Sequence, residues 1–305
     1  SDILALTQTW FTGTEDDPTG IAFSSDGSKM YVVGTFSDTL HQYTLDDAYD
    51  LQTTDYENKF SIETVAYNAQ DVTFNDDGTK MYHVDSTEDA VFEYDLSVAY
   101  DVDTAFYQQK YSVAGQETEP RGLAFNTDGT KMFVTGTTGD DVNEFALSVT
   151  WDVSSATYTR VFSVILDPED VTFSPDGTAM FVVYRSGDSI YQYTLGTGYD
   201  LSTAAYTRSK SITADNTDPT DVVFNASGTK MFTINVAATP DQIVSHTLST
   251  DFDISTAIFE SKFDVTSQAS TLTGLAFNTD GTEMIVLSNG DDAVSKYTLS
   301  TGFDL

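Results

Sequence analysis

Apolar and polar positions repeat along the whole chain with a period of about fifty residues. Each unit has a short apolar segment, a glycine-containing turn and a second apolar segment, as in residues 23–33, FSSDGSKMYVV. The turn glycines are Gly27, Gly78, Gly129, Gly177, Gly228 and Gly281, at intervals of 51, 51, 48, 51 and 53 residues. This period is typical of propeller blades and is too long for ankyrin, tetratricopeptide or leucine-rich repeats.

Each repeat predicts four β-strands. In the first repeat they are residues 20–23, 30–33, 39–45 and 56–62, and an Asp-Gly turn joins the first two. Asp-Gly between apolar runs favours a hairpin, because glycine tolerates the positive φ of such turns. No window has a sustained helical period, and β-branched and aromatic residues dominate. Six such repeats predict an all-β, six-bladed β-propeller with four antiparallel strands per blade.

The N-terminal segment is predicted to complete the last blade. Residues 6–10 match the fourth-strand pattern of residues 158–162, with Leu6 and Trp10 at the aromatic positions, and the last repeat ends after its third strand. Such pairing removes an open sheet edge. We therefore expect residues 1–305 to form a single propeller domain.

The repeat motif resembles those of known propeller families. Residues 173–183, FSPDGTAMFVV, resemble repeats of lactonase-like and NHL-like propellers. Together with residues 151–154 (WDVS) and 200–204 (DLSTA), the pattern is more similar to repeats of marine phage structural proteins and bacterial surface proteins. The resemblance covers the whole chain and implies the architecture together with a virion-associated or extracellular location. Propellers carry many unrelated activities, so the fold alone implies none of them.

Composition narrows the function classes. The chain has 305 residues and no cysteine, which excludes disulfide scaffolds, thiolate metal sites and cysteine nucleophiles. It carries 13 Lys and Arg against 48 Asp and Glu, a net charge of −35, which argues against nucleic acid as a partner. No apolar stretch is long enough for membrane insertion. The oligomeric state stays open.

Three aspartates are predicted to open first strands and to point into the central channel: Asp71, Asp170 and Asp221. The other three blades have glycine at this position. Carboxylate oxygens are ligands that Ca²⁺ prefers, so these residues are candidate ligands of a calcium ion. The alternative is that each aspartate caps the strand entry by accepting nearby backbone N–H groups.

The residue before each opening position adds polar candidates. Arg121 and Glu169 lie there, as does Gln70, the one amide. In a metal-dependent hydrolase or lactonase, the three aspartates would bind the metal, Glu169 would act as base and Arg121 would hold an anion. Lactonase-like propellers mix acidic and amide ligands, and here Gln70 alone supplies an amide.

The loops between second and third strands are acidic in every blade and are predicted to share one face. Their acidic residues are Asp38, Glu88, Asp89, Asp140, Asp141, Asp188, Asp241, Asp291 and Asp292. Such a field attracts cations and basic partners, although turn loops also select aspartate for their geometry. Phe36, Tyr184 and Arg185 depart from this polar pattern, and they either contact a glycan or protein or pack within their loops.

The histidines and lysines are predicted to be structural. His41, His83 and His246 align with aromatic or apolar strand residues, away from the channel rim. Lysines recur after the turns, at Lys29, Lys80, Lys131 and Lys230, and are expected to pair with the preceding turn aspartate.

Two functions from different classes follow. The first is a non-catalytic propeller that binds a receptor, glycan or protein through its acidic face, on a virion or cell surface. The second is the metal-dependent hydrolase or lactonase with its site in the upper channel. The regular repeats and the absence of a Gly-x-Ser-x-Gly elbow, a P-loop or a His-Glu-x-x-His motif favour the first.

Overall fold

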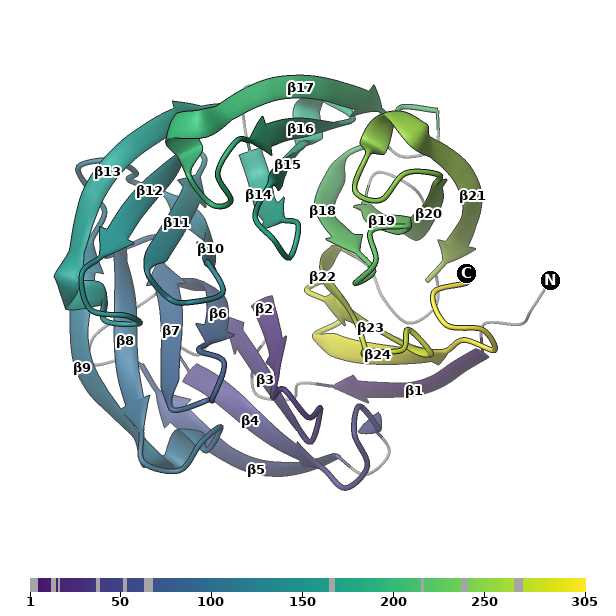
Figure 1. Ribbon diagram of the computed structural model, residues 1–305. Coiled ribbons are helices and arrows are strands. Elements are labelled where there is room, and N and C mark those ends of the chain that lie inside the picture. The colour runs from purple at the N-terminus through teal and green to yellow at the C-terminus, as the bar shows by residue number, and fades with distance from the viewer. Residues whose placement is uncertain are drawn as a thin grey trace. The chain divides into compact units, whose positions relative to one another are not determined.

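A computed structural model gives the fold of the protein and describes residues 5–11, 15, 17–36, 39–51, 54–62, 68–164, 168–214, 217–236, 241–265 and 271–305. The side chains of residues 5–11, 54–58, 169 and 170 lie outside this description. The described residues form six four-stranded antiparallel sheets, which are the blades of a β-propeller (Figure 1). The predicted fold class is therefore confirmed. In the described part, no helix is long and apolar enough to cross a membrane.

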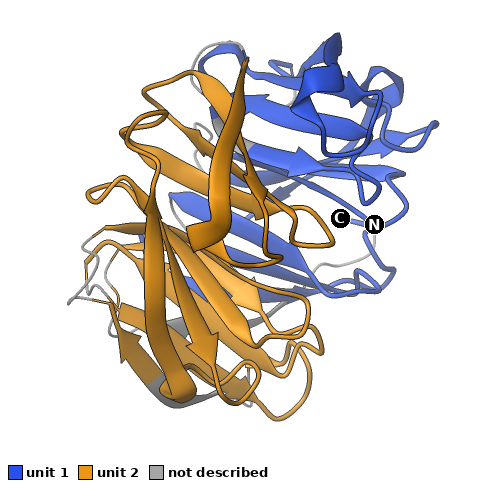
Figure 2. Cartoon of the chain, turned by 60° about the vertical axis from the view of Figure 1, so that its left-hand side comes forward, with its two compact units in different colours: residues 1–11, 164–305 blue, residues 12–163 orange. Residues whose placement is uncertain are grey.

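The chain divides into two compact units (Figure 2). We call residues 12–163, orange in Figure 2, the first unit, and residues 1–11 with 164–305, blue in Figure 2, the second unit. The first unit holds blades 1 to 3. Blade 1 is β2 (Pro18–Phe23), β3 (Lys29–Gly34), β4 (Thr39–Leu45) and β5 (Thr54–Ser61); blade 2 is β6 (Ala69–Phe74), β7 (Lys80–Asp85), β8 (Ala90–Leu96) and β9 (Ala105–Ser112); blade 3 is β10 (Pro120–Phe125), β11 (Lys131–Gly136), β12 (Asp141–Leu147) and β13 (Ala156–Ser163).

The second unit holds blades 4 to 6. Blade 4 is β14 (Pro168–Phe173), β15 (Ala179–Tyr184), β16 (Ser189–Leu195) and β17 (Ala204–Ser211); blade 5 is β18 (Pro219–Phe224), β19 (Lys230–Asn235), β20 (Gln242–Leu248) and β21 (Ala257–Asp264); blade 6 is β22 (Leu272–Phe277), β23 (Glu283–Ser288), β24 (Ala293–Thr298) and β1 (Ala5–Phe11). β1 pairs with β24, so the N-terminal segment completes the last blade as the sequence predicts.

Short 3₁₀ helices lie in two kinds of loop. Among the described residues, four of them precede a fourth strand: η2 (Val102–Thr104), η3 (Val153–Ser155), η5 (Leu201–Thr203) and η6 (Ile254–Thr256). An aspartate caps each of these four, as Asp152 does by accepting the Ser154 N–H. The fifth, η4 (Arg185–Gly187), lies in the loop between β15 and β16. The recurring aspartate after Tyr, Trp or Phe is thus the signal for a capped turn.

An aromatic ring covers every turn glycine. In blade 3, Gly129 has φ of +66° and Trp151 has φ of +60°. The Trp151 N–H donates to the Gly129 carbonyl at 2.9 Å, and its indole lies where a Cβ on Gly129 would be. Tyr49, Tyr100, Tyr199, Phe252 and Phe303 cover the other turn glycines in the same way. Glycine is therefore required twice, for its φ and for the space that the ring occupies.

The turn lysines contact other partners than the sequence led us to expect. Lys80 forms an ion pair with Glu93 and a second one with Asp95 at 2.7 Å, and both partners lie on the third strand of its blade. The turn aspartate Asp77 instead accepts the Thr79 N–H at 3.0 Å and the Thr79 hydroxyl at 2.5 Å. The expected pairing is wrong for Lys80, because the turn itself occupies the aspartate and the lysine lies along the neighbouring strand.

Buried polar side chains tie blade 1 to blade 2 and blade 2 to blade 3. The Gln42 Oε1 accepts the Val102 N–H at 2.7 Å, and the buried Glu93 accepts the Val153 N–H at the same distance. Such bonds satisfy backbone donors that would otherwise be buried without a partner.

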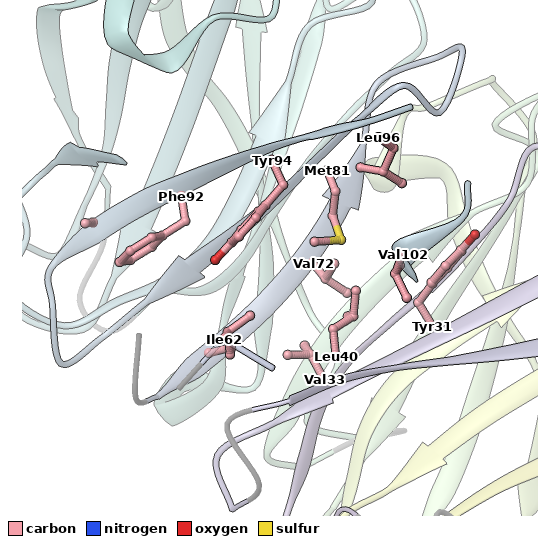
Figure 3. Packing of buried hydrophobic residues seen from close by; sticks show 12 residues of the cluster. Tyr31, Val33, Leu40, Ile62, Val72, Met81, Phe92, Tyr94, Leu96 and Val102 are labelled. Atoms are coloured by element: carbon pink, nitrogen blue, oxygen red, sulfur yellow. The ribbon is translucent and has the colours of Figure 1, made fainter. Parts of the chain in front are cut away.

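Within each unit, the core between neighbouring blades is apolar. Between blades 1 and 2, Tyr31, Val33 and Leu40 pack against Met81 and Tyr94 (Figure 3). The Tyr31 hydroxyl reaches across this core and donates to the Tyr100 carbonyl of blade 2 at 2.5 Å. The blades therefore adhere mainly through buried apolar area, with a few hydrogen bonds that fix their register.

Every outermost strand contains a β-bulge. In β5, β9, β13, β17 and β21, and in β1, the register against the third strand of the blade shifts by one residue in mid-strand. The side of these strands that faces away from the blade carries no further strand of the described sheets. A bulge twists such an edge and disfavours its pairing with another chain.

Candidate functional site

The opening of each first strand is irregular. Register shifts occur there in all six blades, and in blades 1 to 3 the extra residues are Thr19, Gln70 and Arg121. Bulges re-aim a side chain and are frequent beside functional sites. The Thr19 hydroxyl donates to the Ala69 carbonyl at 2.9 Å, and the Gln70 amide donates to Asn68 and Ser86. Arg121 is exposed to solvent.

The carboxylate of Asp71 caps the backbone of two blades. One oxygen accepts the N–H of Val72, its own neighbour, at 2.8 Å. The other accepts the N–H of Leu123, in the first strand of blade 3, at 3.3 Å. This is the capping role that the sequence offered as the alternative to metal binding.

The other two predicted metal ligands lie in the second unit. Asp170 lies in β14 beside Glu169, and both side chains fall outside the described residues. Asp221 lies in β18 and contributes to the wall of a cavity. Among the described residues, no three His, Asp or Glu side chains are placed to share one metal ion. The described side chains therefore do not assemble the predicted calcium site, which stays a prediction.

Buried glutamates brace the acidic loops of blades 1 and 3. Glu117 is 1% exposed and accepts the N–H groups of Glu119, Thr138 and Gly139 at 2.8, 3.2 and 3.0 Å. A Cβ on Gly136 would lie 2.5 Å from its Cδ, so glycine makes room for this carboxylate.

The same arrangement recurs in blade 1. Glu15 accepts the N–H groups of Asp17 and Phe36, beside Gly34. These glutamates were not among the sequence candidates. The sequence feature that could have identified them is a glutamate 19 residues before the glycine that ends the second strand of the blade.

Blade 2 places its bracing carboxylate on the strand itself. Asp85 occupies the position that is Gly34 in blade 1, and it is fully buried. Its oxygens accept the N–H groups of Asn68, Thr87 and Glu88 at 2.7 to 2.8 Å. A single buried carboxylate thus holds the loop in each of the first three blades, because it satisfies several main-chain donors at once.

Several acidic residues of the loops form the turns themselves. Asp89, Asp140, Asp188 and Asp292 each end such a loop with φ between +47° and +52°. Aspartate tolerates this left-handed conformation better than most residues. Turn geometry therefore explains part of the acidic composition. This agrees with the alternative in which turn loops select aspartate for its conformation.

Carboxylates nevertheless gather at one place, across blades 2 and 3. Burial, together with the charges of Glu117, Asp85, Glu88 and Glu119, raises the pKa of Asp89. Burial raises the pKa of Asp141 to about 6, against the hydrogen bond from Asn143, and the charges of Glu117 and Asp140 add to the rise. We call these residues the carboxylate cluster: Asp85, Glu88, Asp89, Glu117, Glu119, Asp140 and Asp141. The charged forms of Asp89 and Asp141 therefore lower the stability of the fold at neutral pH.

The aromatic and cationic candidates of blade 4 pack within the loops. Arg185 binds Asp218 through two nitrogens, one of them Nη2 at 3.0 Å from Oδ2. Asp188 accepts the Asp218 N–H at 2.9 Å, which joins this loop to the start of blade 5. Tyr184 meets Tyr191 edge to face, with ring centroids 5.9 Å apart. Both predicted contact residues thus already have partners inside the second unit.

Phe36 of blade 1 differs from them. Its side chain is 66% exposed, although Glu15 holds its backbone N–H at 3.0 Å. An exposed aromatic on a braced loop is a feature of contact surfaces. The acidic neighbour Asp38 lies outside the described residues.

The three histidines are buried in strands. His41, His83 and His246 are 1%, 2% and 0% exposed. His83 stacks on Phe92 with ring centroids 4.7 Å apart, and burial lowers its pKa to about 4. A buried ring that stays neutral at pH 7 serves the core of blade 2.

A cavity of about 300 Å³ lies along the first strands of blades 4 and 5. Its described lining is Val171, Thr172, Phe173, Pro175, Asp221, Val222, Val223, Phe224, Asn225, Ala226, Phe252 and Leu275. Figure 1 shows the three strands that contribute, β14, β18 and β22, in the second unit. The sequence analysis singled out Asp221 but missed the cavity.

No protein-family model matches this sequence, and no curated protein matches it. Among solved structures, the chain is similar to a candidate 6-phosphogluconolactonase from Bacteroides uniformis (15% identity, TM-score 0.65, covering 92% of this chain and 80% of that one). It is also similar to Kuenenia stuttgartiensis hydrazine synthase (13%, 0.65, 93% and 77%). A third similar structure is the periplasmic gluconolactonase PpgL of Pseudomonas aeruginosa (14%, 0.57, 83% and 71%). These likenesses show the propeller fold alone.

Proposed function

We propose that the chain is a non-catalytic binding module of a virion or cell surface, which contacts a basic protein partner through the carboxylate cluster. The observation that carries this proposal is the gathering of seven carboxylates across blades 2 and 3, where burial and then the neighbouring charges raise the pKa of Asp89 and Asp141. Perturbed pKa values of this kind cluster at functional sites. A cationic partner relieves that repulsion on binding.

The braces support this proposal, because they prepare the surface before a partner arrives. Glu117 and Asp85 each hold three main-chain N–H groups from inside the loops. The loops therefore lose little conformational entropy on binding, which favours affinity.

Two exposed residues of the same unit extend the contact surface. Phe36 offers an apolar ring on the loop of blade 1, and Arg121 offers a guanidinium at the opening of blade 3. Aromatic and arginine side chains contribute most of the binding energy in many interfaces. We expect them to set which basic partner is accepted.

A lysine-rich peptide tests the proposal by titration against the full chain at low and at physiological salt. Replacing Asp140 and Asp141 with Asn keeps the turn and the Asn143 bond but removes two charges, so we expect affinity to fall several-fold. The matched control replaces Asp103 and Asp251, two exposed aspartates of other loops, with Asn. Equal losses of affinity in both variants would show that the peptide responds to net charge alone. Absence of saturable binding to the full chain would contradict the proposal.

Lactone hydrolysis is the second candidate function, because two structural neighbours bear gluconolactonase names. It assigns a Ca²⁺ ion to Asp71, Asp170 and Asp221, with Glu169 as base and Arg121 as anion clamp. Both oxygens of Asp71 already accept backbone N–H groups, which fits this role poorly. A lactone assay with and without added calcium tests it. Hydrolysis that is lost in Asp170→Asn would favour the enzyme over the binding module.

A further inference from the structure

We propose that Asn289 is a modification site, at which the side chain loses ammonia without an enzyme and the residue becomes isoaspartate. This inference concerns blade 6 and does not rest on the proposed function. Asn289 and Gly290 form the one Asn-Gly pair of the sequence. They lie in the turn between β23 and β24, where Gly290 is exposed and Asn289 is partly buried.

The reaction joins two neighbouring residues. The backbone nitrogen of Gly290 attacks Cγ of Asn289, and the new N–C bond closes a succinimide ring. The bond from Cγ to Nδ2 breaks, and ammonia leaves with the proton of the Gly290 N–H. Water then opens the ring at either carbonyl, which gives aspartate or isoaspartate. In isoaspartate the backbone runs through Cβ and Cγ and gains one atom. Glycine favours the first step because it has no Cβ beside the attacking nitrogen.

Gly290 is not needed for the backbone conformation of its turn. Among the described residues, the glycines with positive φ are the turn glycines of the repeat, such as Gly281, and Gly290 does not belong to them. In this loop the left-handed residue is Asp292, with φ of +49°. The loops of blades 1 to 4 carry Thr-Phe, Ser-Thr, Thr-Thr and Arg-Ser where blade 6 has Asn-Gly. The pair is therefore a departure from the repeat that the conformation does not require.

The Asp-Gly turns of the repeat are rival sites, because they could form the same ring by losing water, but the fold holds their carboxylates. The Asp77 Oδ1 accepts both the N–H and the hydroxyl of Thr79. These bonds keep the pKa of Asp77 below its usual value, so the group stays ionised. An ionised carboxylate reacts poorly with a nucleophile. The same bonds recur at Asp26, Asp128, Asp176 and Asp280.

Asparagines in the turns are held as well. In blade 6, the Asn278 Oδ1 accepts the Glu283 N–H at 3.0 Å, and its Nδ2 donates to the Thr282 hydroxyl at 3.1 Å. The equivalent bonds occur at Asn75, Asn126 and Asn225. Every asparagine of the chain except Asn289 is followed by a residue with a Cβ. Asn289 should therefore react before any of them.

The modification changes a loop that is tied to the start of its blade. The Asn289 N–H donates to the Thr271 carbonyl at 3.0 Å, and the equivalent bond occurs in blades 1 to 3. An extra backbone atom directly after this donor alters the path of the turn. The new carboxylate also stands close in sequence to Asp291 and Asp292. We expect both effects to weaken the attachment of the loop.

Incubation of the full chain at mildly alkaline pH, followed by proteolysis and mass spectrometry, tests the assignment. We expect Asn289 to exchange its NH₂ group for OH, and in water enriched in heavy oxygen the product should carry the label. An isoaspartate methyltransferase assay identifies the isomer. The rate in the folded chain should lie within about tenfold of the rate in urea, because exposed loops open at little cost. The Asp-Gly turns are the internal control, since they should isomerise faster in urea than in the folded chain.

Three variants complete the test. Gly290→Ala should slow the loss of ammonia by at least about tenfold, because the added Cβ crowds the attacking nitrogen. Gly115→Ala, at an open position elsewhere, should leave the rate unchanged. Asn289→Thr, with the residue of blades 1 and 3, should give no product in this loop. A folded-chain rate below the stated limit would overturn the assignment. So would an unchanged rate in Gly290→Ala, or modification that appears first at an Asp-Gly turn.

Discussion

Replacing Gly129 with alanine places a methyl group where the indole of Trp151 now lies. Two costs add. The residue keeps a φ of +66°, which costs an L-residue about 1–2 kcal/mol. The Cβ also lies closer to the indole than real Cβ contacts do, so Trp151 must move.

The second cost follows from what Trp151 contacts. Its ring centroid lies 5.2 Å from that of Phe125 and 6.3 Å from that of Tyr82. Aromatic pairs contribute about 0.5–1.5 kcal/mol each, so disturbing both costs about 1–3 kcal/mol. We therefore expect Gly129→Ala to lower the free energy of unfolding by about 2–5 kcal/mol in total.

A double-mutant cycle separates the two costs. In a Trp151→Ala background the clash is absent, so Gly129→Ala should cost only the φ contribution, about 1–2 kcal/mol. Urea unfolding followed by far-ultraviolet circular dichroism measures all four proteins, because two of them lack Trp151 and their fluorescence is not comparable with that of the others. Gly115→Ala is the control, since a Cβ there meets no atom within 4 Å.

The reasoning fails if Gly129→Ala costs the same with and without Trp151. The indole of Trp151 would then contribute nothing to the cost, and the turn glycine would be needed for its φ alone. A neutral Gly129→Ala would refute both contributions.

Three further outcomes are expected from unfolding measurements. His83 has a pKa of about 4 in the folded chain and about 6.5 unfolded, so the free energy of unfolding should fall by up to about 3 kcal/mol as the pH drops from 6.5 to 4. The variant His83→Val, which carries the blade 1 residue at this position, should not show this decrease. The pKa of Asp141 is raised to about 6, so Asp141→Asn should stabilise by roughly 1 kcal/mol at pH 7.5 after screening, and the gain should vanish near pH 4. Tyr82→Phe removes the 2.6 Å bond to the Trp151 carbonyl and should lower the free energy of unfolding by about 1–2 kcal/mol. Adding Glu93→Gln to this variant should restore part of that loss. A double variant whose loss equals the sum of the two single losses would count against this reasoning.

The last of these expectations comes from a comparison between blades. In blade 4, Phe181 has no hydroxyl, and Gln192 serves both backbone groups of the next blade: its Oε1 accepts the Ile254 N–H at 3.1 Å and its Nε2 donates to the Phe252 carbonyl at 2.8 Å. In blade 2, Glu93 can only accept, so Tyr82 supplies the donor. In these two blades, the carbonyl thus takes its donor from different positions.

Local signals in the repeat were sufficient to predict the strands and the pairing of the N-terminal segment. Asp-Gly turns and alternating apolar residues act over a few positions, so the sequence carries them directly. Contacts between blades depend on residues about fifty or more positions apart, as between Asp71 and Leu123, and no single repeat contains them. The bond of Asp71 to the next blade and the bracing role of Glu117 therefore emerged only from the structure.

The candidate sites were likewise predictable only in part from the sequence. Asp221 was identified from its position in the repeat, but a cavity is the space left by side chains of several strands, which a period does not describe. The interruption of the repeat at Asn289 and Gly290 was visible in the sequence. Recurring residues mostly serve the blade, so departures from the repeat are positions to test for a site.

The pairing of β1 with β24 has a kinetic consequence. Phe11 lies opposite Ala293, so roughly 280 residues must be made and ordered before the first strand of the chain finds its partner. Closing a loop of that length costs about 3 kcal/mol more entropy than closing a ten-residue loop, and none of it is recovered until the sixth blade forms. Of the described strands, β1 is therefore made before all the others and pairs last. A circular permutant that carries residues 5–11 behind residue 305 would turn this slowest closure into a local hairpin, and it would fold faster than the natural chain order with the same sheets.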